Sequence, residues 1–368
     1  MEEKITDTRQ LVFWDSFGFY SRHSGIYRYA TSLADCLETQ GFHPRFLVSE
    51  NSRSLSHTTE PLSLSPRRQR IKSLWASWAY GELCERYRGP LLFHGLSNLN
   101  LPLKKKNPQH VFFLTLHDGI PLVAPRGVSV SVALQSRLLL PFVVSLADRI
   151  ICVSRWTMDW VESAYPKARG KCVHIPNGFS PWRASSIFSL PGAKLRVLVV
   201  SRFEKYKQFD LLVKILQKTG DLFSVTVVSD FRGAAFLRER LGKNQQGITL
   251  LSAIEEGTLQ RLYGASDVLL HTSRFEGFCL PAAEALACGV PVVFCRGSGI
   301  DEVVGASVGS GLEATAPVSQ WVDALEGWGQ KRRTSEFQQS CCLYVGGQVQ
   351  WSQAADLLLK EYRLFAFS

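Results

Sequence analysis

Two glutamates and a pair of basic residues are the side chains whose types and spacing could do chemistry in this sequence. Glu276 and Glu284 have seven residues between them, in a stretch rich in glycine and alanine. Arg202 and Lys207 lie in another stretch, where they could neutralise a pyrophosphate through charge-assisted hydrogen bonds. Because carboxylates accept hydrogen bonds from hydroxyl groups, the combination predicts a ligand that carries both hydroxyls and phosphates.

The two glutamates must be positioned by a strand, a loop and a helix. Residues 268–270 form an apolar run short enough for a buried parallel strand. Pro281 stands where the first residue of a helix is expected and Gly289 where that helix ends, since each residue is favoured there. We expect Glu284 on the first helical turn, leaning toward the loop of Glu276. The helix start would offer free N–H groups to a phosphate, although the helix dipole alone also favours a glutamate there.

The stretch 272–293 resembles the signature of glycosyltransferase family 4, retaining enzymes of the GT-B fold, including its glutamate–seven residues–glutamate motif. By this resemblance Glu276 contacts hydroxyls of the transferred sugar, and Glu284 binds the nucleotide ribose. Cys279 stands where many family members have glycine, and its small side chain still lets the backbone approach a phosphate. The residues between the glutamates complete the expected donor site: Gly277, Phe278, Cys279 and Leu280.

The second basic stretch follows a predicted strand over residues 195–201. Arg202 and Lys207 therefore stand at the carboxyl end of a strand and before a helix, a common ligand position in parallel sheets. A solvated loop is the structural alternative. The resemblance places the family's phosphate-binding arginine and lysine at these two positions, with Lys205 as the second candidate for the lysine.

The N-terminal half carries further candidates. Gly25 opens a helix after a first strand and, by resemblance, contacts the donor phosphate. His94 and His117 each end a strand, and the pair His117-Asp118 resembles the family's histidine-aspartate motif near the transferred sugar. His117 is therefore the stronger catalytic candidate, while a lone histidine such as His94 is commonly structural.

Composition describes an ordinary globular protein. The sequence has 368 residues, which favours two domains, with 45% hydrophobic and 20% charged residues. Nine cysteines without paired spacing predict reduced thiols in the cytosol. No signal peptide and no bilayer-spanning stretch is recognisable, so we expect a cytoplasmic protein.

Most of the net charge of +10 lies in residues 1–180. The charge could attract an anionic acceptor, nucleic acid or the inner face of a membrane, or simply cover a solvated surface. Residues 67–80, basic and then aromatic, are one candidate for membrane contact. Their tryptophans, Trp75 and Trp78, could equally pack into the core. No nucleic-acid-binding module is recognisable, so we expect no nucleic-acid partner.

Alternating strands and helices predict an α/β protein with parallel sheets. The resemblance implies the GT-B fold, two Rossmann-like domains facing across a cleft. We expect an acceptor domain over residues 1–184 and a nucleotide-sugar domain over 185–354, with a linker at 180–191. The helix at 355–368 would return to the first domain.

The expected activity is a retaining hexosyl transfer from a nucleotide-diphosphate sugar to a glycan or lipid-linked acceptor. Resemblance favours mannosyltransferases of surface-polysaccharide and lipopolysaccharide assembly, with GDP-mannose as the first donor and a UDP-sugar as the second. The nucleotide-sugar is a substrate, so no cofactor is expected. No Asp-x-Asp motif occurs, which argues against a metal-bound diphosphate.

The sequence leaves three alternatives to a transferase. The first is another GT-B activity, a phosphorylase or an epimerase. The second is a non-catalytic protein that binds nucleotide-sugars. The third, a nucleic-acid-binding protein, rests on the net charge alone.

Overall fold

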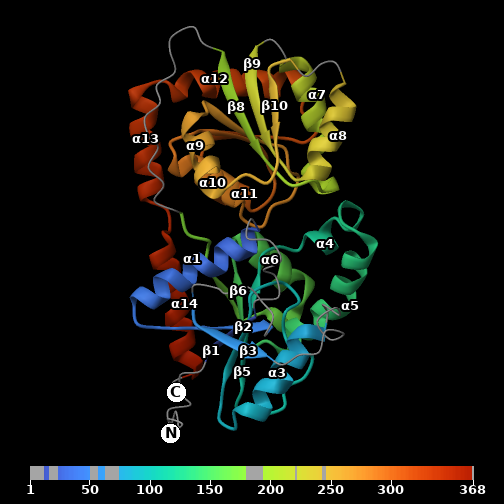
Figure 1. The fold of residues 1–368 in the computed structure, drawn as a ribbon, viewed down its shortest axis with the longest axis vertical. Coiled ribbons are helices and arrows are strands. Elements are labelled where there is room, and N and C mark those ends of the chain that lie inside the picture. Colours follow the sequence, from blue (N-terminus) through green and yellow to red (C-terminus); the bar gives the residue numbers. More distant parts are fainter. Residues whose placement is uncertain are drawn as a thin grey trace. The chain divides into compact units, whose positions relative to one another are not determined.

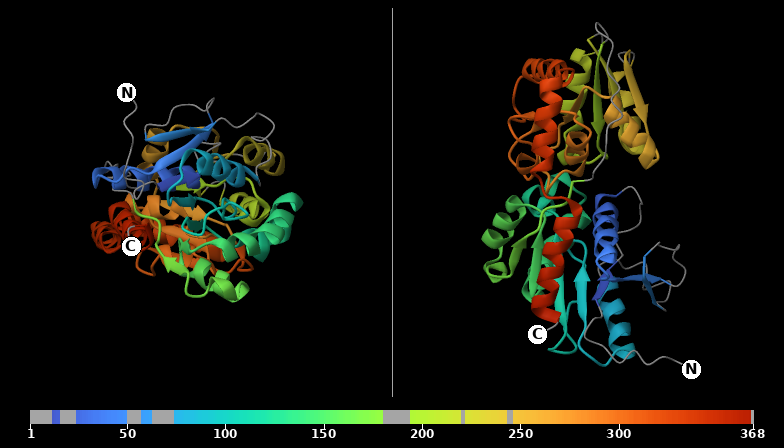
Figure 2. Two further views of the ribbon diagram at one scale, coloured as in Figure 1. Left: turned by 90° about the horizontal axis from the view of Figure 1, so that it is seen from below. Right: turned by 90° about the vertical axis from the view of Figure 1, so that its left-hand side faces the viewer.

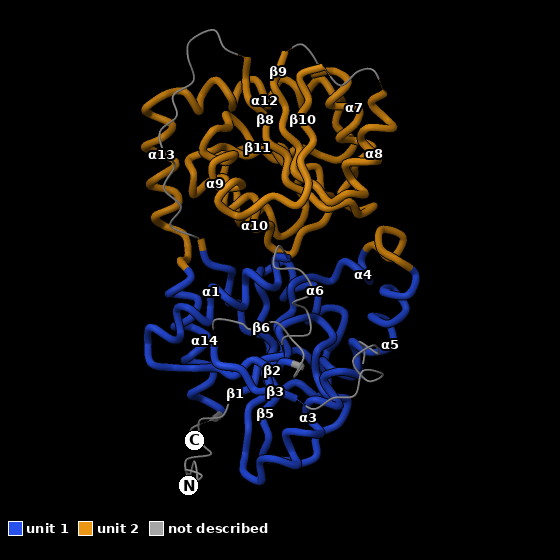
Figure 3. Tube along the Cα trace, viewed as in Figure 1, with its two compact units in different colours: residues 1–123, 130–178, 351–368 blue, residues 124–129, 179–350 orange. Residues whose placement is uncertain are grey.

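The computed structural model describes residues 12–15, 24–49, 57–62, 74–179, 194–219, 222–242 and 246–366. The chain forms two compact units (Figure 3). Unit 1 contains residues 1–123, 130–178 and 351–368, and unit 2 contains residues 124–129 and 179–350.

Unit 1 is built on a parallel sheet of seven strands in the order β3-β2-β1-β4-β5-β6-β7. The order reverses between β1 and β4, as in doubly wound nucleotide-binding sheets. The strands are short and mostly apolar, which suits a sheet covered on both faces. Their bounds are β1 Val12–Asp15, β2 Arg45–Ser49, β3 Thr59–Leu62, β4 Leu92–Gly95, β5 Val111–Leu116, β6 Arg149–Cys152 and β7 Cys172–His174.

Helices cover both faces of this sheet (Figure 2). Serine side chains cap two of them: Ser24 accepts a hydrogen bond from the N–H of Tyr27, and Ser154 accepts one from Thr157. The helices of unit 1 are α1 Gly25–Thr39, α3 Trp75–Arg86, α4 Ile120–Val123, α5 Val130–Leu146, α6 Arg155–Ala164, η4 Pro166–Ala168 and α14 Trp351–Ala366.

The helix α14 belongs to unit 1 although unit 2 precedes it in the sequence. It packs against α1 (Figure 1). The hydroxyl of Tyr362 lies 2.8 Å from Nε1 of Trp14 on β1 and 2.6 Å from Nδ1 of His94 on β4. Arg149 and Glu361 form an ion pair of 2.6 Å. These contacts tie the end of the described chain into the core of the first sheet.

Unit 2 repeats the same architecture with six parallel strands in the order β10-β9-β8-β11-β12-β13. Its order reverses between β8 and β11. The strands are β8 Leu195–Val200, β9 Phe223–Val228, β10 Ile248–Leu251, β11 Val268–His271, β12 Val292–Cys295 and β13 Gly309–Leu312. The helices are η3 Pro125–Gly127, η5 Lys205–Lys207, α7 Phe209–Thr219, α8 Phe231–Leu241, α9 Glu256–Ala265, α10 Leu280–Ala287, α11 Ile300–Val303, α12 Val318–Arg332 and α13 Ser335–Gly346.

A stretch whose composition favours a loop is in part a strand. Residues 50–65 are rich in serine and threonine, yet β3 lies among them and pairs with β2. The carboxylate of Glu60 holds this edge strand through ion pairs of 3.1 Å with Arg45 and with Arg86. Pro61 is tolerated because an edge strand can spare an N–H. Residues 50–56 and 63–65 lie outside the described residues.

The aromatic part of the stretch 67–80 packs into the core, which was the alternative to membrane contact. Trp75 is buried, and its Nε1 donates a hydrogen bond of 2.6 Å to Asp15 at the end of β1. Trp78 is partly buried against the same core. Residues 67–73 and the predicted linker at 180–191 lie outside the described residues. Among the helices that the structure describes, none has both the length and the hydropathy needed to span a bilayer.

Candidate functional site

The candidate site lies where the strand order of unit 2 reverses. β8 and β11 are parallel neighbours, so their carboxyl ends reach the same edge of the sheet. The loop after β8 carries Arg202, Lys205 and Lys207, and the loop after β11 carries Glu276. Ligands of open parallel sheets bind at this edge and at this reversal point.

Backbone contacts hold the two loops together. The N–H of Arg274 donates to the carbonyl of Tyr206 at 2.9 Å. The hydroxyl of Thr272 donates to the carbonyl of Lys207, also at 2.9 Å. These bonds bring the side chain of Lys207 beside Glu276, although 69 residues separate the two in sequence.

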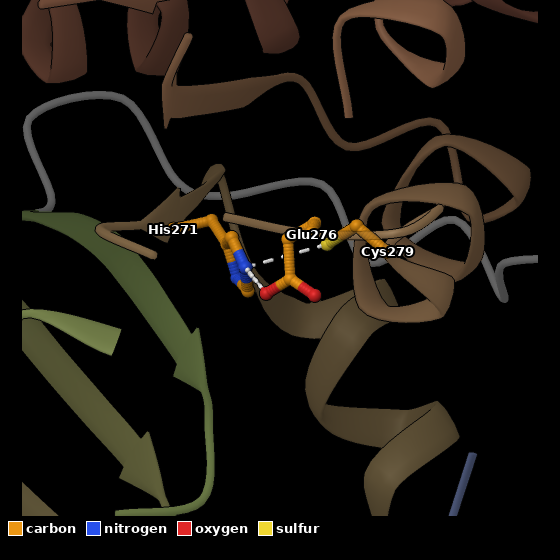
Figure 4. Close-up of side chains that lie close together, drawn as sticks. All are labelled: His271, Glu276 and Cys279. Carbon is orange, nitrogen blue, oxygen red and sulfur yellow. Dashed lines mark hydrogen bonds and ion pairs between the residues drawn. The ribbon is translucent and has the colours of Figure 1, made fainter. Parts of the chain in front are cut away.

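The carboxylate of Glu276 is held through one of its oxygens (Figure 4). Oε1 accepts a hydrogen bond from Nζ of Lys207 and another, of 2.6 Å, from Nε2 of His271. The sulfur of Cys279 lies 3.4 Å from the same Nε2. The described contacts of the carboxylate all fall on Oε1, so Oε2 can accept a hydrogen bond from a ligand.

Charge is compensated inside this cluster. Burial acts to raise the pKa of the Glu276 carboxyl, but the Lys207 ammonium and the His271 hydrogen bond outweigh it and hold that pKa well below its usual range. Burial acts to lower the pKa of Lys207, and the charge of Glu276 raises it above its ordinary value. Both groups are therefore charged at neutral pH. Burial, together with the charge of Glu276, raises the pKa of the Cys279 thiol, which stays protonated.

A second loop fixes the backbone of Glu276. The N–H of Glu276 donates to the hydroxyl of Ser298 at 3.1 Å, and the N–H of Gly299 donates to the Glu276 carbonyl at 2.9 Å. A Cβ on Gly299 would lie 2.0 Å from the carbonyl oxygen of Gly277, so only glycine fits at this approach. The glycine-rich turn at 297–302 therefore contacts the loop of Glu276.

The prediction that Glu284 lies on the first turn of its helix is wrong. α10 begins at Leu280, one residue before Pro281, so Glu284 is the fifth helical residue and belongs to the second turn. Its side chain is buried, and Oε2 accepts a hydrogen bond of 2.9 Å from the hydroxyl of Tyr263. The first turn of α10 contains no acidic residue.

The other predicted donor-binding residues of unit 2 lie around this cluster. Gly277, Phe278 and Cys279 are buried, and the ring of Phe278 packs edge-on against Phe179 at 6.4 Å. Arg202 and Lys205 are exposed on the loop after β8. The lysine that contacts Glu276 is Lys207, whereas the role of each residue toward a ligand stays a prediction.

The remaining predicted residues belong to unit 1. Gly25 is the exposed first residue of α1. His117 follows β5, and its Nε2 donates a hydrogen bond of 2.8 Å to the carbonyl of Leu96. Burial lowers the pKa of His117 to about 4, so its ring is neutral near pH 7 and keeps an acceptor lone pair on Nδ1.

His94 is an interior residue. Its two ring nitrogens lie within hydrogen-bond distance of Tyr362 and Thr115, and burial lowers its pKa to about 3. Such a satisfied, fully buried imidazole supports a structural role, which agrees with its place as the weaker sequence candidate.

Several polar residues that the folded chain brings to the two sheet edges were not predicted from the sequence. His271 is the last residue of β11, and Tyr263 reaches the site from α9. In unit 1, Asp15 ends β1, and Asn98 accepts the N–H of His117 at 2.9 Å. A polar residue at the end of an apolar strand was the available signal for His271 and Asp15.

Comparison with known proteins identifies the family. The model described as Glycosyltransferase Family 4 matches residues 23–183, and the model described as Glycosyl transferases group 1 matches residues 182–336. Together they cover residues 23–336 of the 368. The chain belongs to glycosyltransferase family 4.

This family 4 chain is 29% identical over 236 residues to D-inositol 3-phosphate glycosyltransferase from Mycobacteroides abscessus, which covers 60% of this chain and 52% of the relative. It therefore spans about half the length of the curated relatives that it matches. Its fold matches sucrose-phosphate synthase from Thermosynechococcus elongatus with a TM-score of 0.79 at 20% identity, over 98% of this chain and 100% of the other. It also matches Anabaena HepE in complex with UDP and glucose, with a TM-score of 0.68 at 15% identity over 96% and 98%. These matches confirm the predicted GT-B fold.

Proposed function

We propose that the chain is a retaining glycosyltransferase that moves a hexosyl group from a nucleotide-diphosphate sugar to a glycan or lipid-linked acceptor. The observation that carries the proposal is the contact of Lys207 and His271 with one oxygen of Glu276 at the strand-order reversal of unit 2. Membership of family 4 supports the transferase class.

The geometry supplies groups for both halves of such a donor. Oε2 of Glu276 would accept a hydrogen bond from a sugar hydroxyl while Oε1 stays fixed by the protein. Lys207, Arg202 and the N–H groups at the start of α10 would stabilise the charge that develops on the departing diphosphate. Glu284 would bind the ribose from the second turn of the helix.

The proposed reaction retains the anomeric configuration. The acceptor hydroxyl oxygen attacks the anomeric carbon on the face from which the diphosphate departs. The bond from that carbon to the phosphate oxygen breaks, and the departing phosphate takes the acceptor's proton. A retaining glycosidase would instead need a second carboxyl about 5–5.5 Å from the first. Here the carboxylate of Glu276 is ion-paired with an ammonium.

GDP-mannose is the proposed donor, with a UDP-sugar second, and no cofactor or metal is required in this scheme. HepE, whose fold this chain shares, was solved with UDP and glucose. We propose that the acceptor binds unit 1, near His117. Assembly of a surface polysaccharide or lipopolysaccharide in the cytoplasm is the proposed setting.

Peripheral membrane contact is proposed for α5. Val130, Leu134, Leu138 and Phe142 are spaced by four residues, so they share one face, and all four are exposed. Leu138 is 57% and Phe142 62% exposed, and Arg137 beside them is exposed as well. An apolar helical face in a basic unit suits an anionic lipid surface, where a lipid-linked acceptor would lie.

A donor panel tests the proposal. GDP-, UDP- and ADP-sugars should be compared for thermal stabilisation, which reaches about 2.7 kcal/mol at a hundredfold excess over Kd. The accepted donor should then release its nucleoside diphosphate only when an acceptor is present. Glu276→Gln should still bind the free nucleotide but lose turnover. A protein that only binds nucleotide-sugars would release no nucleotide, and a phosphorylase would need inorganic phosphate; either result would overturn the proposal.

A further inference from the structure

Three side chains that could bind a metal lie close together at the end of β11 and in the loop that follows it (Figure 4). Nε2 of His271, a carboxylate oxygen of Glu276 and Sγ of Cys279 all lie within 4.8 Å of one another. In the proposed transfer the imidazole only positions Glu276, and the thiol has no role. We propose that these side chains form an inhibitory site for a thiophilic divalent cation of the zinc type.

The donor set and its spacing fit such an ion. Zinc binds sulfur at about 2.3 Å and nitrogen or oxygen at about 2.0–2.2 Å, so tetrahedral ligand atoms are roughly 3.2–3.7 Å apart. Nε2 of His271 and Sγ of Cys279 are already 3.4 Å apart. Nε2 and Oε1 are 2.6 Å apart and must separate by less than about 1 Å, which small side-chain rotations supply. A water molecule would complete the tetrahedron.

The backbone of Cys279 is the second observation. Its φ of 80° lies in the left-handed region, where glycine is at ease and a side chain costs about 1–3 kcal/mol. The cysteine occupies this position and places its sulfur against His271. A phosphate-binding turn would be served by glycine at this position without strain. Cysteine here instead adds a thiol that can bind a metal together with the imidazole and the carboxylate.

The ion would compete with Lys207 for Glu276. The ammonium of Lys207 is on a long side chain that is 15% exposed, so it can swing aside when a cation takes Oε1. The thiol proton leaves to solvent on binding, and the imidazole proton moves to Nδ1 so that Nε2 is free to ligate. The divalent cation, one thiolate and one carboxylate together have no net charge. The metal-bound site therefore does not repel the displaced ammonium of Lys207. Because the thiol must lose a proton, affinity rises with pH.

The inhibitory effect rests on the proposed function, whereas binding of the cation does not. With the ion on Oε1, the carboxylate must turn away from its 2.6 Å contact with His271, so Oε2 would leave the position in which it accepts the sugar hydroxyl. Lys207 would also lose its partner at this position. Transfer would therefore be slowest in the metal-bound state.

Cobalt(II) is the probe for this site, because a thiolate ligand gives it a near-ultraviolet charge-transfer band. Full-length protein, kept reduced, should bind one equivalent with that band, and zinc should displace the cobalt. Cys279→Ser should remove the band, while Cys342→Ser, which changes an exposed cysteine elsewhere in unit 2, should keep it. Lys207→Met should tighten binding roughly tenfold or more, because the competing ammonium is gone.

The proposal is overturned if the band is missing at one equivalent, if it survives in Cys279→Ser, or if Lys207→Met weakens binding. Cys279→Gly, which suits the left-handed backbone, replaces the serine variant if that variant does not fold. The absorbance needs no sugar donor, so a protein that binds cobalt in this way but transfers no sugar would refute the proposed function alone.

Discussion

Glu276 is a buried carboxylate whose charge is balanced by the Lys207 ammonium and whose Oε1 also accepts a hydrogen bond from His271. At the scale of the residue, this arrangement makes Lys207 and Glu276 depend on each other. Removing one partner of a buried ion pair leaves an uncompensated charge, while removing both can be nearly neutral.

Lys207→Met should therefore lower the free energy of unfolding by about 3 kcal/mol, because Glu276 stays buried without its cation. The double variant Lys207→Met, Glu276→Gln should recover most of that loss. Urea denaturation of the two single variants and the double variant measures the coupling. Additive effects of the two changes would show that the pair is not coupled.

His271 is expected to position Glu276 for the sugar. His271→Ala removes one of the two described donors to Oε1, so kcat/KM should fall about 10–100-fold, and His271→Gln should restore part of it. Release of nucleoside diphosphate measures both variants. His110→Gln is the matched control, because His110 is a buried histidine bonded to Tyr80 in unit 1. An equal loss of kcat/KM in that control would show that buried histidines matter only for stability.

At the scale of elements, the site depends on three loops held at fixed separations. The closest approach is at Gly299, where a methyl group would meet the carbonyl oxygen of Gly277. The loops after β8, β11 and β12 thus act as one assembly, and a change in any of them should reach Glu276.

Gly299→Ala should destabilise unit 2 by about 1–3 kcal/mol and lower turnover, because the added Cβ forces the two loops apart. Gly327→Ala is the control, since that helical position in α12 has nothing within 4 Å of a new Cβ. In this control we expect the free energy of unfolding to rise by about 0.5–1 kcal/mol, because alanine is favoured over glycine inside a helix. Thermal or urea unfolding ranks the two variants, and similar losses in both would contradict the packing argument.

The exposed face of α5 gives a prediction about membranes. The double variant Leu138→Asp, Phe142→Asp should reduce binding to vesicles that contain anionic lipid, because it places two charges on the apolar stripe. Flotation with such vesicles measures the loss. Phe231→Asp in α8 of unit 2 changes an equally exposed aromatic residue and should leave binding intact. Equal losses in both would place membrane contact elsewhere.

Elements were predictable where their pattern was strong. The apolar runs that became β5 and β11, and the serine cap of α6, follow directly from local sequence. β3 was missed because its strand is short and polar, and it is held by ion pairs to residues distant in sequence. The start of α10 was misplaced by one residue, since proline is favoured at the first helical position but is also tolerated at the second.

At the scale of the whole molecule, the two sheets have the same order over six strands, although the first sheet has a seventh. Each sheet is therefore expected to bind a ligand at its own point of strand-order reversal. The motif predicted that place in unit 2. It did not predict His271 or Tyr263, because the contacts of these side chains depend on the folded sheet and carry no local pattern. The roles of Gly25, Arg202 and His117 rest on resemblance and stay predictions.

His94 and His117 in unit 1, whose pKa values are lowered by burial, make stability depend on pH. Burial lowers the pKa of His94 to about 3 and of His117 to about 4, against about 6.5 in the unfolded chain. Their neutral forms stabilise the fold fully above pH 6.5, and stability falls below it as only the unfolded state takes up protons. Each should contribute up to about 1.4 kcal/mol per pH unit between pH 6 and 5. Denaturation at several pH values measures how steeply the free energy of unfolding changes with pH. His94→Asn should remove the part of this slope that His94 contributes. An unchanged slope would contradict the lowered pKa of His94.

The return of α14 to the first sheet sets an order of events during synthesis. Trp14 and His94 emerge early from the ribosome, but Tyr362, which joins them in the core, is made only after the whole of unit 2. All of unit 2 is therefore made before the helix that completes unit 1. A released chain truncated after residue 350 should contain a protease-resistant second unit and a protease-sensitive first one.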